Sequence, residues 1–119
     1  MKVAVTSTGK LLESEVDPRF GRALYILIID TDTLAFEAVD NSGNANAFKG
    51  AGIGAATMVS DRGAEVLMTG YCGPKAFMTL AAAGVRVVSD ISGRVMDAVA
   101  AFNDGKVAYA TDANKEAHW

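Results

Sequence analysis

Positively charged side chains stand in three glycine-bearing segments of the chain, where their types and spacing could build an anion pocket. The cations and their segments are Arg19 and Arg22 in 17–22 (DPRFGR), Lys49 before 50–54 (GAGIG), and Lys75 at the end of 70–75 (GYCGPK). Glycine turns beside a strand end or a helix start leave backbone N–H groups free to face a ligand. No acid occurs at 41–60 or 66–89, although the net charge of the chain is −3. We therefore expect an anion site if the fold brings the three segments together.

The same segments contain the candidate binding residues. We expect the cations to neutralise an anionic ligand, while backbone amides at 50–54 and 72–75 donate hydrogen bonds to it. Cys72 precedes an expected helix start, which predicts a lowered thiol pKa and a thiolate that could contact a soft metal or a sulfide. The candidate binding residues are Arg19, Arg22, Lys49, Gly50, Gly52, Gly54, Cys72, Gly73 and Lys75, and Cys72 is also the candidate metal ligand.

Each of these features also has a purely structural interpretation. The glycines at 50–54 could merely allow a helix to pack closely on a sheet. Asp17 could pair with one of the two arginines on the surface, and Cys72 could be a small half-buried residue. The coincidence of cations and glycines in all three segments favours the binding interpretation.

The sequence lacks residues that a dinucleotide site, a zinc site or a catalytic site would need. The string 50–55 (GAGIGA) fits a loose dinucleotide-binding pattern, but nine loop residues precede it, and the next strand ends in Thr69 and Gly70 instead of an acid. One cysteine and one histidine, His118 in the C-terminal tail, cannot complete a zinc site. Without a histidine in the folded body or an acid in the first strand, neither a catalytic triad nor a metal-nuclease site is expected. We expect no enzymatic activity.

Length and composition limit the class of protein. A chain of 119 residues is one domain, and its negative net charge argues against general nucleic-acid binding. The single cysteine excludes an internal disulfide and suits a reducing compartment. No apolar run approaches the roughly 18 residues that a membrane span requires. A cytoplasmic location is therefore the expectation.

Hydrophobic patterning predicts an α/β domain in which flanking helices cover a mixed five-stranded sheet. The strand–helix units need parallel crossovers, whereas the turn at 31–33 predicts an antiparallel hairpin. In the tail from 106 to 119, 107–110 could add an edge strand and 111–119 is expected to be an exposed terminus. Four methionines, Met58, Met68, Met78 and Met96, have the spacing of core residues. The expected strands are 2–7, 23–30, 34–40, 65–69 and 85–88, the expected helices are 51–62, 75–83 and 93–103, and 41–49 is expected to be a flexible loop.

Three strings closely resemble the dinitrogenase iron–molybdenum cofactor biosynthesis family. They are 17–23 (DPRFGRA), 50–56 (GAGIGAA) and 69–77 (TGYCGPKAF), and they occur in the family's order and spacing. The likeness runs from residue 1 to about 105, so 1–105 is expected to form the family's domain and 106–119 a tail. The resemblance implies a ribonuclease-H-like fold without nuclease activity.

The resemblance also implies that the chain carries or shelters a metal–sulfur cluster. Its length looks most like that of the family's stand-alone members, for which a molybdenum–copper sulfide cluster held without covalent attachment is implied. An iron–molybdenum cofactor precursor is the other implied cargo, although the histidine ligand of the cofactor carriers has no match in 1–105. One cysteine cannot supply the usual four thiolates of an iron–sulfur cluster. A preassembled thiometallate anion, whose metals are saturated by its own sulfides, needs only N–H donors, cations and a soft wall.

Two other functions could use the same loops. One is a docking or regulatory protein for a P-loop ATPase or a cofactor-assembly enzyme. The other is a binding module for a nucleotide or another phosphorylated small molecule. We expect no nucleic-acid or membrane partner, and either a monomer or a weak homodimer, since a two-fold pair could enclose a cluster between two pockets.

Overall fold

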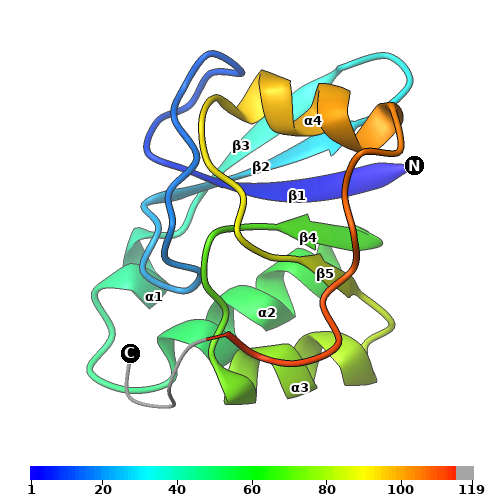
Figure 1. The fold of residues 1–119 in the computed structure, drawn as a ribbon. Helices are drawn as coiled ribbons and strands as arrows, with labels where there is room; N and C mark the ends of the chain where they lie inside the picture. Colours follow the sequence, from blue (N-terminus) through cyan, green and yellow to red (C-terminus); the bar gives the residue numbers. More distant parts are fainter. Residues whose placement is uncertain (115–119) are drawn as a thin grey trace.

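The structure is a computed structural model that describes residues 1–114. Within these residues, five strands form one mixed sheet with the order β3-β2-β1-β4-β5 (Figure 1). The strands are β1 (Lys2–Ser7), β2 (Tyr25–Asp30), β3 (Phe36–Asp40), β4 (Val66–Met68) and β5 (Arg86–Val88). The predicted mixed five-stranded sheet is confirmed, and each strand lies within two residues of its predicted bounds.

The strand directions place most loops of interest on one side of the sheet. β1 is antiparallel to β2, with Lys2 opposite Asp30, and β2 is antiparallel to β3. β1, β4 and β5 are parallel to one another, with Val3 opposite Val66 and Val66 opposite Arg86. β1, β3, β4 and β5 therefore all end at the same edge, which we call the site edge. This arrangement is the ribonuclease-H-like motif expected from the sequence.

Helices cover both faces of the sheet. α2 and α3 pack side by side on one face, and α4 lies on the other (Figure 1). Both α2 and α3 begin at the site edge, because each follows a strand that ends there. The helices are α1 (Ser42–Ala45), α2 (Ala51–Asp61), α3 (Pro74–Ala82) and α4 (Val95–Asn103). No helix within residues 1–114 has the length and apolar character that crossing a bilayer requires.

Strand side chains alternate between two hydrophobic cores. Ile26 and Ile28 of β2 face the α2 and α3 side, whereas Leu27 and Ile29 face the α4 side, and all four are buried. This confirms the prediction that the run 23–30 is a central strand buried on both faces. Burial of each such side chain contributes about 1.5–3 kcal/mol, so the sheet is a firm base for the loops at its edge.

The prediction of a flexible loop at 41–49 is wrong in part. The short helix α1 occupies Ser42–Ala45, and the segment is tied down from outside. Asn41 is buried, and its Nδ2 donates to the carbonyl oxygens of Ala23 and Gly21 at 2.7 and 3.3 Å. The polar residues that suggested flexibility are thus used to fix the segment to the start of β2.

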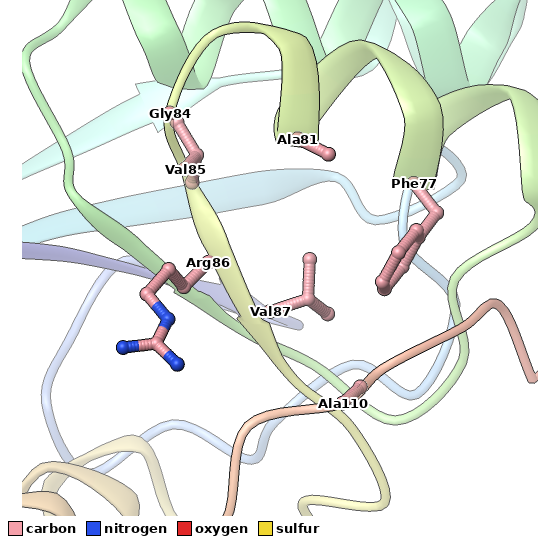
Figure 2. Close-up of a pocket in the computed structure, with 7 residues that line it drawn as sticks. All are labelled: Phe77, Ala81, Gly84, Val85, Arg86, Val87 and Ala110. Carbon is pink, nitrogen blue, oxygen red and sulfur yellow. The ribbon is translucent and has the colours of Figure 1, made fainter.

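Residues 106–114 form a strap that runs from the end of α4 past the edge strand β5 to the start of α3 (Figure 1). No strand is assigned at 107–110, but the Ala110 N–H donates to the Val87 carbonyl at 2.7 Å. Ala110 lies beside a hollow of about 240 Å³ between α3 and β5 that none of the predicted binding residues lines (Figure 2). His118 and the rest of the predicted terminus from 115 onward lie outside the described residues.

Candidate functional site

The three cationic segments meet at the site edge. We name them the arginine loop (17–22), the α2 start (49–54) and the α3 start (70–75). Backbone hydrogen bonds join the first to the third: the Tyr71 N–H donates to the Pro18 carbonyl at 2.6 Å, and the Phe20 N–H donates to the Tyr71 carbonyl at 3.1 Å. A Cβ on Gly70 would lie only 2.7 Å from Pro18 Cα. These two loops are therefore in direct backbone contact.

Glycines also bring the α2 start against its neighbours. A Cβ on Gly21 of the arginine loop would lie 2.9 Å from the Cα and N atoms of Gly52. A Cβ on Gly52 would lie 3.0 Å from the Cβ of Ala76, in the first turn of α3. Real Cβ atoms essentially never come this close to backbone, so position 21 requires glycine, whereas a Cβ at position 52 would have to displace Ala76 by a few tenths of an ångström. The condition on which the predicted anion site depends, that the three segments come together, is met.

Buried polar side chains hold the arginine loop to the ends of β1 and β4. The Thr6 hydroxyl donates to the Asp17 carbonyl at 2.6 Å and lies 2.9 Å from the Thr69 hydroxyl. The buried Asp17 carboxylate accepts the Arg19 N–H at 2.9 Å, and its Oδ1 lies 3.6 Å from Arg19 Nε. Because 54% of the Arg19 side chain is exposed, its guanidinium keeps donors for another anion beside Asp17.

Arg22 has a different environment from Arg19. Its Nη1 donates to the carbonyl oxygens of Ala45 and Ala47, each at 2.9 Å. The half-buried guanidinium therefore closes α1 and the following turn onto the arginine loop. Arg22 shapes the segment that leads to Lys49, and its role in neutralising a ligand stays a prediction.

Lys49 and Lys75 are exposed at the two helix starts. Neither ammonium group has an ion pair among residues 1–114. Neither α2 nor α3 has a capping side chain or an acid in its first turn. First-turn N–H groups have no partner within their own helix and carry partial positive charge. Each helix start thus combines free amides, a helix dipole and a lysine.

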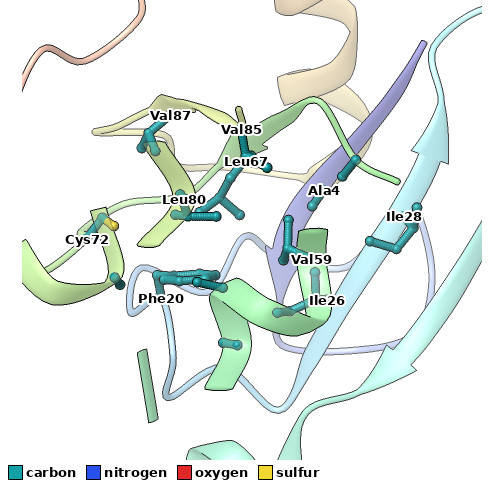
Figure 3. Packing of buried hydrophobic residues seen from close by; sticks show 14 of the residues in the cluster. Ala4, Phe20, Ile26, Ile28, Val59, Leu67, Cys72, Leu80, Val85 and Val87 are labelled. Atoms are coloured by element: carbon teal, nitrogen blue, oxygen red, sulfur yellow. The ribbon is translucent and has the colours of Figure 1, made fainter. Parts of the chain in front are cut away.

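Cys72 lies in the core instead of facing a ligand. Its side chain is fully buried in the same cluster as Phe20 and Leu80 (Figure 3). Burial raises the pKa of the Cys72 thiol from 9.0 to about 12. The predicted lowered pKa is wrong, because desolvation of the thiolate outweighs the helix dipole. A metal contact by Cys72 stays a prediction, and its burial speaks against it.

Asn114, at the end of the strap, is a residue that no sequence motif indicated. Its Oδ1 accepts the Cys72 N–H at 2.8 Å, and its own N–H donates to the Cys72 carbonyl at 3.1 Å. Its Nδ2 donates to the Gly70 carbonyl at 3.0 Å and to Asp90 Oδ1 at 3.3 Å. The strap therefore ends on the α3 start, and it brings the Asp90 carboxylate close to this loop.

Protein side chains offer no ready-made metal centre in the part of the chain that the structure describes. No three side chains of His, Cys, Asp or Glu lie together there so that they could hold an ion. What converges instead is a set of lysine and arginine side chains with backbone amides. Such a set suits an anion that brings its own metal ligands.

The fold and this loop junction define a small α/β domain of the ribonuclease-H-like type whose cationic loops meet at one sheet edge. Residues 1–105 match the family described as dinitrogenase iron-molybdenum cofactor. The chain belongs to this family, as its motifs indicated. A search of curated proteins gave no match.

Solved structures agree with the family assignment. The apo form of the orange protein from Desulfovibrio gigas is 48% identical, with 96% of each chain covered and a TM-score of 0.93. A putative NifB protein from Thermotoga is 38% identical, with 98% of each chain covered and a TM-score of 0.83. A putative dinitrogenase from Methanocaldococcus jannaschii is 11% identical with a TM-score of 0.69, covers 94% of this chain and 96% of its own, and shows the fold alone.

Proposed function

We propose that this protein is a non-catalytic carrier that holds a metal–sulfur cluster without covalent attachment at the junction of the three loops. The observation that supports this function most directly is the backbone contact among the arginine loop, the α2 start and the α3 start. The contact gathers two helix starts and their cations around one place. Each helix start contributes about 0.3–1 kcal/mol toward an anion when exposed, and up to about 2 kcal/mol when partly buried.

The donor set fits a cluster that is already complete. Cys72 is fully buried, and burial raises the pKa of its thiol to about 12, so Cys72 would have to leave its buried position to reach a cluster as a thiolate. A thiometallate anion, whose metals are saturated by sulfide, would instead accept hydrogen bonds at sulfur and pair with cations. A molybdenum–copper sulfide anion is the proposed cargo, and an iron–molybdenum cofactor precursor is the alternative cargo.

The proposal assigns different tasks to the predicted site residues. Arg19, Lys49 and Lys75 neutralise the anion, since their charged groups are exposed and not fully used by the protein. Amides of 51–53 and of 72, 73, 75 and 76 donate to its sulfurs. Arg22 fixes the loop before Lys49. Gly52 lets α2 approach Ala76 of α3 closely, Gly54 lies against the Asn44 side chain of α1, and Gly50 supplies the left-handed conformation, with a φ of +75°, from which α2 begins.

A charge-matched comparison tests the carrier function. The site variant combines Arg19→Gln, Lys49→Gln and Lys75→Gln. The control variant combines Lys2→Gln, Arg62→Gln and Lys106→Gln, which removes the same charge away from the loop junction. We expect the site variant to lose uptake of tetrathiomolybdate with copper, followed anaerobically by visible spectra and elemental analysis, while the control retains it. Equal retention by both variants, or equal loss, would contradict the proposed site.

A docking function has one observation in its favour. Phe48, directly before Lys49, is 92% exposed, and such an aromatic side chain beside cations is typical of a protein-contact surface. If the protein is a docking module for a P-loop ATPase or a cofactor-assembly enzyme, Phe48→Ser should abolish partner binding by the apo protein and leave thiometallate uptake unchanged.

A phosphometabolite module would instead show saturable nucleotide or phosphate binding that the site variant loses.

A further inference from the structure

The strap ends in a set of hydrogen bonds that lie on the proposed site itself. Asn114 occupies both backbone groups of Cys72, the N–H through its side-chain Oδ1 and the carbonyl through its main-chain N–H. Its Nδ2 adds bonds to Gly70 and Asp90. One residue thus joins the end of β4, the loop after β5 and the last turn before α3.

The Cys72 N–H is one of the amides that the sequence marked as donors to a ligand. In the structure the carboxamide oxygen of Asn114 accepts this N–H at 2.8 Å. An N–H group donates one good hydrogen bond, so an anion and Asn114 cannot both use it fully. The Asn114 side chain therefore stands where an acceptor atom of a ligand would stand.

The attachment of the strap is uneven along its length. At its beginning, Val107 and Tyr109 pack on the α4-side core, and the Arg86 guanidinium lies 3.6 Å from the centroid of the Tyr109 ring. Ala110 adds its hydrogen bond to Val87. Between Ala110 and Asn114, the only hydrogen bond formed within the described residues is local, from the Ala113 N–H to Asp112 Oδ1. Among the residues that the structure describes, Asn114 therefore makes the hydrogen bonds that join 111–114 to the rest of the domain.

Asn114 is exposed to solvent, although it forms four hydrogen bonds. Water can replace these bonds when the strap end moves away, and no buried side chain has to leave the core. Opening at Ala110 would release the Cys72 N–H and the Gly70 and Cys72 carbonyls together. The core beneath, including the Cys72 side chain, would stay packed.

We infer that Asn114 is a latch: it closes the strap over the α3 start and must open before an anion can take the Cys72 amide. This inference rests on the proposed function and adds a regulation of that same site. Only molecules with an open latch bind the anion. The apparent affinity is therefore the intrinsic affinity multiplied by the fraction of molecules that are open. Binding of an anion would in turn favour the open strap, since the two sites are linked.

Amide hydrogen exchange by NMR and titration with tetrathiomolybdate test the latch in the full chain. Asn114→Ala should speed exchange of the Cys72 N–H at least tenfold and tighten tetrathiomolybdate binding at least threefold. Asn114→Asp should speed exchange of the Cys72 N–H as well, because it loses both Nδ2 donations and places a carboxylate opposite Asp90. Thr111→Ala, in the same strap at a residue that forms no hydrogen bond within 1–114, should change neither quantity. In the wild-type protein, saturating tetrathiomolybdate should speed exchange of the Asn114 N–H.

The outcomes separate the latch from the carrier function. Unchanged Cys72 exchange in both Asn114 variants would overturn the latch, whatever the protein binds. Weaker tetrathiomolybdate binding in Asn114→Ala would also overturn it, because Asn114 would then position the loop for the ligand instead of blocking it. Absence of binding in the wild type and in both variants would overturn the proposed cargo and, with it, the regulation. Retained protection of the Asn114 N–H in the loaded protein would likewise contradict the opening.

Discussion

At the site edge of the sheet, Gly21 and Gly70 lie against other loops, whereas at the opposite edge Gly63 and Gly84 lie in open turns. A Cβ on Gly21 or Gly70 would meet the backbone of another segment within 3 Å. At the opposite edge, Gly63 follows α2 and Gly84 follows α3; both have a φ of +79°, and a Cβ on either would meet nothing within 4 Å. The first pair is required by the space between segments, with a left-handed φ of +91° at Gly21 in addition, and the second pair by local backbone conformation alone.

This difference shows that contacts between separate loops build the site edge, whereas local turns build the opposite edge. The turns at the opposite edge are local, because each glycine serves only the helix end before it. At the site edge, the arginine loop touches both helix starts, so a change in one loop displaces the others. We therefore expect substitutions at the site edge to affect stability and binding together, and those at the opposite edge to affect stability alone.

The largest effect is expected for Gly21→Ala compared with Gly63→Ala. Both positions have a left-handed φ, +91° and +79°, which costs alanine about 1–2 kcal/mol. Gly21→Ala must also displace the backbone of Gly52, and such overpacking costs about 1–3 kcal/mol more. Urea denaturation should show the free energy of unfolding reduced by about 2–5 kcal/mol for Gly21→Ala and by about 1–2 kcal/mol for Gly63→Ala.

Tetrathiomolybdate binding should also distinguish Gly21→Ala from Gly63→Ala. Gly21→Ala should weaken tetrathiomolybdate uptake in the molecules that remain folded, because the α2 start is pushed away from the arginine loop. Gly63→Ala should bind as the wild type does. If both variants lost the same free energy of unfolding, the close approach of Gly21 to Gly52 would cost alanine nothing beyond the strain of its left-handed φ.

A smaller effect is expected from pH, and it has opposite signs at the two edges. Burial raises the pKa of Cys72 to about 12, so the unfolded chain, with an ordinary value of 9.0, loses this proton first as pH rises. Its stabilisation is complete below pH 9 and is lost toward pH 12, by at most about 1.4 kcal/mol per pH unit. At the opposite edge, the Asp32 and Thr33 N–H groups lower the pKa of the exposed Asp30 carboxyl, so its small contribution is lost as pH falls.

Denaturation of the wild type and of Cys72→Ala between pH 8 and 11 measures the alkaline part. Lysine and tyrosine ionise in both proteins, so the difference between the two slopes isolates the thiol. We expect the wild type to lose stability more steeply than the variant above pH 9. If stability fell equally steeply with pH in both proteins, the thiol would reach solvent in the folded protein, and its role as a metal contact would become tenable again.

Much of the fold could be predicted because local patterns were sufficient for it. The alternation in 2–7, the apolar run at 23–30 and the glycines after α2 and α3 each indicate an element through its own residues. The glycine-rich strings also identified the loops that meet at the site edge. Methionines were less informative: Met68 is buried as predicted, whereas Met78 is 70% exposed, since helical spacing alone does not tell which helix face is covered.

The site details that could not be predicted depend on contacts between distant residues. Nothing near Arg22 in the sequence shows that Ala45 and Ala47 will present carbonyl oxygens to it. The raised pKa of Cys72 follows from the packing of several elements around it, which a helix-start argument does not include. Asn114 lies 42 residues from Cys72 and belongs to no motif. The sequence indicated which loops could form a site, whereas their meeting and the partners of each side chain required the structure.

The smallest effect is expected at the opposite edge, for the ion pair between Arg62 and Glu37. Arg62 Nη1 lies 2.6 Å from Glu37 Oε2, but both side chains are exposed, and such pairs contribute at most about 1 kcal/mol. Arg62→Gln should therefore lower the free energy of unfolding by less than about 1 kcal/mol, and added salt should reduce the difference. The same variant should keep wild-type affinity for tetrathiomolybdate. The length of α2, about 16 Å for its 11 residues, separates this charge from the α2 start, which is more than the screening length of about 8 Å at physiological salt. A loss of affinity as large as that of Lys75→Gln would mean that the total charge of the domain, and not the place where its loops meet, attracts the anion.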